Sequence, residues 1–135
     1  MATLKISDLS VGDWVEIDHE DYGWQQAQIN VCGDLGIGAY FKDIDPEEEH
    51  DCTLSQARPI PITPEILKAN GWQRNEEDEY MEYYGDPTSG IAHTKGTCHY
   101  RLEAPEVSVV CYFVHQLQHA LRLAGVEKEI VMPNK

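Results

Sequence analysis

Two prolines separated by a single residue divide this sequence into two parts. Each proline fixes its own backbone φ angle and disfavours the helical conformation in the residue before it, so Pro59-Ile60-Pro61-Ile62 must run extended. The chain has 135 residues, which suffices for one domain or two very small ones. We therefore expect one subdomain over residues 1–59 and a second over residues 60–135, packed together as one compact unit.

The part before the prolines has the pattern of short strands. Residues 13–17 and 25–31 alternate apolar and polar side chains, which is typical of strands with one buried face. Residues 35–41 form a third strand, with glycines where a bend or a close backbone approach is needed. After an acidic loop, residues 52–60 can supply a short closing strand. The pattern predicts a small antiparallel β-barrel.

The part after the prolines mixes helix and sheet. Thr63 stands at a helix N-cap, Pro64 at the first helical position and Asn70-Gly71 at the exit, so a short helix is expected. An antiparallel sheet follows, and a last helix beginning near Tyr112 ends at Gly125. Its apolar stripe consists of Phe113, Leu117, Ala120, Leu121 and Ala124. The fold class is α+β: a β-barrel, then a helix, an antiparallel sheet and a C-terminal helix.

Acidic side chains outnumber basic ones by 24 to 10, which gives a formal charge of −14. Such a field repels phosphate backbones and anionic lipids, so we expect neither direct nucleic-acid binding nor membrane binding. The acidic residues gather in two runs. Either the runs are solvated loops and exposed strand faces, or they meet a basic protein surface, even as a mimic of nucleic acid. The binding candidates among them are Asp43, Asp45, Glu47, Glu48, Glu49, Asp51, Glu76, Glu77, Asp78 and Glu79.

The cysteines and the hydropathy pattern bear on the compartment. Cys32, Cys52, Cys98 and Cys111 show no close pairing, and the N-terminus has no apolar run typical of a secretion signal. No window approaches the roughly 20 apolar residues of a membrane helix. We expect a cytoplasmic protein with reduced thiols.

Two tryptophans of the barrel region have two possible roles. Trp14 and Trp24, with the neighbouring Tyr22, Tyr40 and Phe41, could line a cage for a cationic group, as in Tudor-like modules. The alternative, packing in the core or at the rim of the barrel, is favoured for most of these rings, because so small a barrel uses nearly every large side chain to fill itself. Both interpretations stay open at the level of sequence.

A metal site is a further hypothesis. Cys111, His115 and His119 recur every four residues, so on one helix they would project from the same face, and Cys98 or His99 could complete a tetrahedral set. The alternative is an ordinary helix whose histidines are hydrogen-bonded within the fold, and this alternative implies no cofactor. Periodicity places no nucleophile beside a general base, so we expect no enzyme activity. The glycines at 33, 36 and 38 have no Lys or Arg beside them, which disfavours a phosphate-binding loop.

Two resemblances follow from these motifs. The segment Leu9-Ser10-Val11-Gly12-Asp13-Trp14-Val15 with its short strands resembles a Src-homology-3-type, Tudor-like barrel. The segment Ile60 to Leu67, the triplet Asn70-Gly71-Trp72 and the closing Val114-His115-Gln116-Leu117-Gln118 resemble a family of small uncharacterised proteins of gut anaerobes and their phages. That resemblance implies a shared fold and a cytoplasmic protein often carried on mobile DNA, and it implies no activity. The family usually has asparagine where this chain has His119.

The sequence thus favours a non-enzymatic acidic binding protein. Its partner would be a protein with a basic surface, and its specific form an inhibitor of a nucleic-acid-handling or defence protein of the host. Two alternatives remain: a small-molecule binder or metabolite sponge, and a metal-dependent or thiol enzyme.

Overall fold

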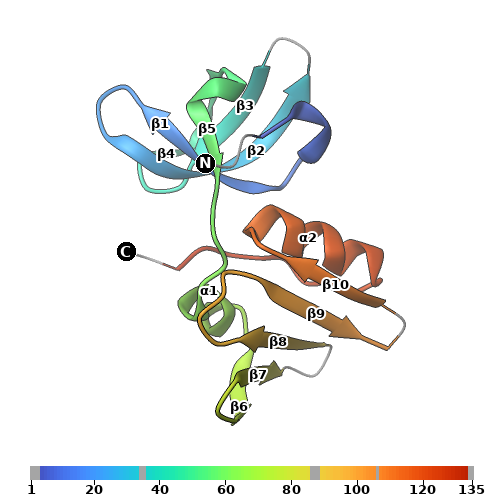
Figure 1. Cartoon of the computed structure of the whole chain (residues 1–135). Helices are drawn as coiled ribbons and strands as arrows, with labels where there is room; N and C mark the ends of the chain where they lie inside the picture. The colour runs from blue at the N-terminus through green and yellow to red at the C-terminus, as the bar shows by residue number, and fades with distance from the viewer. Residues whose placement is uncertain (1–3, 34–35, 86–88, 106, 134–135) are drawn as a thin grey trace. The chain divides into compact units, whose positions relative to one another are not determined.

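The computed structural model describes residues 4–33, 36–85, 89–105 and 107–133 and confirms the α+β class. The chain divides into two compact units, Met1–Ile60 and Pro61–Lys135, at the extended proline segment. Each unit contains one five-stranded antiparallel sheet (Figure 1). Among the described residues, no helix combines the length and the apolar character needed to cross a bilayer.

The first unit is an antiparallel sheet in the order β4-β3-β2-β1-β5. Its strands are β1 (Trp14–His19), β2 (Gly23–Gly33), β3 (Gly36–Phe41), β4 (Asp45–Cys52) and β5 (Ala57–Pro59). Two single 3-10 turns, Ile6–Asp8 and Leu54–Gln56, precede β1 and β5. The closing strand pairs with β1 as Val15 opposite Pro59 and Ile17 opposite Ala57. The first three strands lie where the sequence predicts them, although Asp13, expected on the polar face, is buried.

One face of this sheet forms the core of the first unit. Val15 and Ile17 of β1 are fully buried, and their neighbours in the sheet present Ala27, Ile29 and Phe41 to the same cluster. Successive side chains on a strand point to opposite faces, so the residues between them lie on the outer face. Burial of the apolar set fixes the register, because a shift by one residue would turn every one of these side chains to water.

The acidic segment after β3 is a strand where a loop was expected. Residues Asp45–Cys52 form β4, which pairs with β3 as Gly38 opposite Asp51 and Ala39 opposite His50. The strand lies at the edge of its sheet, and Glu47, Glu48 and Asp51 are exposed. An edge strand with so little buried surface lacks the alternation that reveals a strand in the sequence.

The second unit carries both helices and the second sheet. Its elements are α1 (Pro64–Ala69), β6 (Gln73–Glu77), β7 (Met81–Gly85), β8 (Gly90–Thr94), β9 (Tyr100–Ala104), β10 (Val107–Cys111) and α2 (Val114–Leu123). The strands lie in sequence order, β10-β9-β8-β7-β6, and α2 lies against β10 and β9 (Figure 1). Tyr84, Ile91 and Leu102 stand side by side across β7, β8 and β9 and are almost completely buried.

Both helices have the ends that the sequence predicts, although the last helix begins later. The Thr63 hydroxyl accepts a hydrogen bond from the Ile66 backbone N–H at 3.3 Å, and Gly125 adopts φ +74° after the last turn. At the start of α2, Gln116 Oε1 accepts from the backbone N–H groups of Tyr112 and Phe113 at 2.8 and 3.2 Å. These bonds cap the N-terminus of α2, so the helix begins at Val114.

The segment after α2 returns to the exit of α1. Asn70 is buried, and its Nδ2 donates to the Ile66 and Val131 carbonyls, each at 2.8 Å. Its Oδ1 accepts from the Val131 N–H at 2.8 Å, so one amide side chain pairs with the tail as a neighbouring strand would. Ile130 and Met132 on either side are buried. The sequence identified Asn70 only as part of a helix exit.

Candidate binding surface

The first acidic run is a charged strand at a sheet edge. Glu47, Glu48, Glu49 and Asp51 on β4 all have exposed side chains, Asp45 opens the strand, and Asp43 precedes it. Lys42 reaches Asp43 at 3.3 Å, and Asn30 Nδ2 donates to Glu49 Oε1 at 2.7 Å. The structure therefore brings most of this run together along one edge.

The second run is split between surface and structure. Glu76 and Glu77 end β6, the edge strand of the second sheet, and are exposed, as is Glu79 in the turn. Asp78 instead holds the turn, because its Oδ1 accepts from the Tyr80 and Met81 N–H groups at 2.8 and 2.7 Å. These two bonds lower the pKa of the Asp78 carboxyl.

Glu82 on β7 belongs to the fold of the second unit. Its Oε1 lies 2.9 Å from His93 Nδ1, and its Oε2 lies 3.1 Å from Arg74 Nη1. The hydrogen bond from His93, followed by that from Arg74, lowers the pKa of Glu82. The carboxylate is thus engaged on both oxygens and is not available to a partner.

This Glu82–His93 pair resembles a catalytic dyad only at first sight. The second ring nitrogen of His93, Nε2, lies 2.9 Å from the Thr97 carbonyl oxygen, and the ring stacks on Tyr100 at 4.1 Å between centroids. Both nitrogens therefore face acceptors within the fold, which leaves neither to take a proton from a substrate. Burial raises the pKa of the adjacent Tyr100 hydroxyl to about 12, so this group is no nucleophile at neutral pH.

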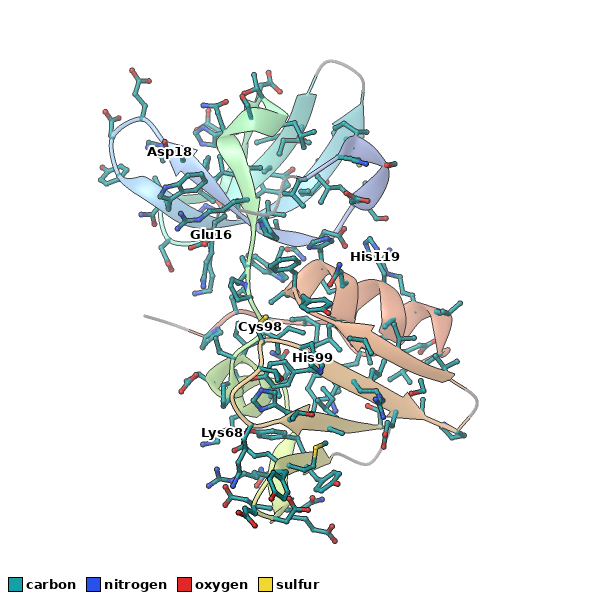
Figure 2. The ribbon with its side chains drawn as sticks, in the orientation of Figure 1. Glu16, Asp18, Lys68, Cys98, His99 and His119 are labelled. Atoms are coloured by element: carbon teal, nitrogen blue, oxygen red, sulfur yellow. The ribbon has the colours of Figure 1, made fainter. Side chains whose placement is uncertain are left out.

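The two tryptophans of the first unit differ in their surroundings. Trp14 is 8% exposed and so offers little surface. Trp24 already carries a cation, because the Arg58 guanidinium carbon lies 3.9 Å from its ring centroid and Arg58 Nε bonds Glu16 Oε1 at 3.0 Å. Glu16 and Asp18 extend from β1 on this face (Figure 2). A foreign cation at Trp24 would have to displace this internal ion pair.

The hypothesis of three ligands on one helix is wrong in its geometry. Cys111 is the last residue of β10, three positions before α2 begins, so helical spacing does not apply to it. Only His115 and His119 share the helix, with ring centroids 5.9 Å apart, and Cys98 and His99 lie before β9 (Figure 2). In the described part of the chain, no three His, Cys, Asp or Glu side chains come together to hold a metal. The spacing argument did not take into account that Gln116 can cap the helix at Val114, which leaves Cys111 outside it.

Two of the thiols, Cys52 and Cys111, are unsuited to nucleophilic chemistry. Burial raises the pKa of Cys111 to about 11, and burial together with the neighbouring Asp51 raises the pKa of Cys52. Both groups therefore stay protonated at neutral pH, whereas reactive cysteines have a lowered pKa.

Comparison with protein-family models, with curated protein sequences and with solved structures gave no match. The candidate surface therefore rests on its own geometry, namely exposed carboxylates at one edge of each sheet.

Proposed function

We propose that this protein acts without catalysis, by binding a partner protein of basic character through the carboxylates of β4 and of the β6–β7 hairpin. The observation that carries the proposal is the position of both acidic runs at sheet edges, where Glu47, Glu48 and Glu76 face solvent. Glu77 is exposed as well, with Oε2 2.7 Å from Lys95 Nζ. A strand edge presents backbone as well as side chains, so a partner would meet a linear array of negative charge. Complementary charge of this kind increases the association rate and selects the partner.

The resemblance to proteins of gut anaerobes and their phages gives the proposal a specific form. We propose an inhibitor carried on mobile DNA that acts in the cytoplasm on a nucleic-acid-handling or defence protein of the host. Such proteins expose basic grooves for phosphate backbones, and a folded acidic surface competes for the same groove.

The experiment is affinity capture of host proteins on the immobilised chain, followed by elution with rising salt. We expect a basic protein to be retained at low salt and released as ionic strength rises, because contacts between exposed charges are screened. The control is the variant E47Q/E48Q/E76Q/E77Q, which preserves side-chain shape and removes four charges. If this variant retains the same protein up to the same salt concentration, the acidic surface is not the binding determinant.

A further inference from the structure

We propose that a hollow on the outer face of strands β2, β3 and β4 receives a lysine or arginine side chain of the partner. This inference rests on the proposed function and identifies the contact at which the partner is recognised. The hollow has a volume of about 500 Å³ and opens to solvent. It is lined by Val31, Gly33, Gly36, Ile37, Gly38, Glu49, Asp51 and Cys52.

The hollow exists because glycines occupy the end of the β2–β3 hairpin. Val31 pairs with Gly38, and Gly38 pairs with Asp51, so these three residues form one row across the outer face of the sheet. Gly33 and Gly36 pair with each other in the next row on the same face. A Cβ atom at Gly33 would meet nothing within 4 Å, so this position is open, with Val31 on one side of the hollow and Glu49 and Asp51 on the other.

At two of the glycines, Gly36 and Gly38, an added side chain would collide with residues of β4 that line the hollow. A Cβ atom at Gly36 would lie 2.5 Å from the Cys52 carbonyl oxygen, and the backbone there has φ +141°. A Cβ atom at Gly38 would lie 2.8 Å from Glu49 Cδ. Because Gly38 has no side chain, the Glu49 side chain can lie over the sheet at this position.

Glu49 is also held from a second strand. Asn30, in the irregular part of β2 between Ile29 and Val31, donates from Nδ2 to Glu49 Oε1 at 2.7 Å. One carboxylate oxygen is fixed in this way, and the carboxylate is positioned before any partner arrives. Preorganisation of this kind reduces the ordering cost of binding.

The chemistry of the lining selects a cation with an apolar stem. Glu49 and Asp51 supply two carboxylates, and no Lys or Arg is among the described residues that line the hollow, so an anion would meet repulsion. Val31 is 51% exposed and offers apolar surface to the methylene groups of a lysine or arginine, whose charged head would meet the carboxylates.

The position of the hollow favours a side chain presented by a protein. Small-molecule pockets bury about 70–90% of their ligand, and an open depression on a sheet face does not enclose one to that extent. β4 is the edge strand, so an extended segment of a partner can approach along it. A second copy of this chain is disfavoured as the occupant, because it brings the same excess of 24 acidic over 10 basic residues.

The test compares two double variants that each remove two negative charges from the first unit. E49Q/D51N changes the hollow, and E20Q/D21N changes two exposed carboxylates in the turn between β1 and β2, outside the proposed binding surface. The probe is a fluorescein-labelled octa-arginine peptide, with octalysine as a second probe, titrated into the full chain at low salt and followed by anisotropy. Amide shifts of the ¹⁵N-labelled chain locate the contact and confirm that both variants are folded.

We expect E49Q/D51N to weaken binding about five- to tenfold and E20Q/D21N about twofold or less, because only the former loses direct charge contacts. The shifts should centre on Val31, Gly36 and Gly38. Equal weakening by both variants, or shifts confined to the second unit, would overturn the hollow and leave the general acidic surface intact. Failure of the unaltered chain to bind either peptide at low salt would contradict the proposed function as well.

Discussion

At the scale of single residues, position decides which carboxylates of an acidic run are structural. Glu82 is held by His93 and Arg74, and both bonds lower its pKa. A carboxyl group whose pKa is lowered by folding stabilises the fold above the pH at which the unfolded group titrates, and this stabilisation disappears as the pH falls through the folded value. An unperturbed glutamate titrates at about pH 4.3. The contribution of Glu82 is therefore present at neutral pH and is lost as the pH falls below about 4.3.

The corresponding prediction concerns E82Q. We expect the variant to be less stable than the unaltered chain at about pH 7 and to approach it at about pH 3.5, because the carboxylate contributes only when ionised. Urea unfolding followed by circular dichroism across this range measures the difference. E76Q, at an exposed position on β6, is the matched control and should show little effect. A constant difference between E82Q and the unaltered chain at every pH would show that the ion pair is not its source.

At the scale of elements, the sequence predicts those whose signal is local. The cap at Thr63, the stop at Gly125 and the burial of Val15 and Ile17 each depend on a few neighbouring side chains, and each is found in the structure. The strand β4 was missed because an exposed edge has no hydrophobic period. The excess of acidic residues and their grouping into two runs are enough to identify the binding candidates from the sequence. The hollow could not be identified in this way, because it depends on the register that pairs Gly38 with Val31 and Asp51, and this register shifts at the irregularity between Ile29 and Val31.

The contact between α1 and the tail is also non-local, and it yields a stability prediction. N70A removes both hydrogen bonds to Val131 and leaves those backbone groups unpaired, which costs about 1–3 kcal/mol. N70D should be at least as destabilising at neutral pH, since its carboxylate would face the Ile66 and Val131 carbonyl oxygens. Urea unfolding measures the loss, and faster amide exchange at Val131 locates it. K68A, on the exposed side of α1 (Figure 2), is the control, and an equal loss there would refute the role of Asn70.

At the scale of the whole molecule, the charge of −14 acts on folding and on binding with opposite dependence on salt. A large net charge destabilises a compact chain by self-repulsion, and the Debye length falls from about 30 Å at 0.01 M salt to about 10 Å at 0.1 M. We therefore expect the thermal midpoint to rise over this range of sodium chloride, while affinity for a basic peptide falls. Differential scanning calorimetry measures the former and peptide anisotropy the latter. The variant E47Q/E48Q/E76Q/E77Q carries less charge, so both of its salt dependences should be shallower. A midpoint that fell with salt would mean that attractive pairs such as Arg58 with Glu16, 3.0 Å apart, outweigh the repulsion among the excess carboxylates.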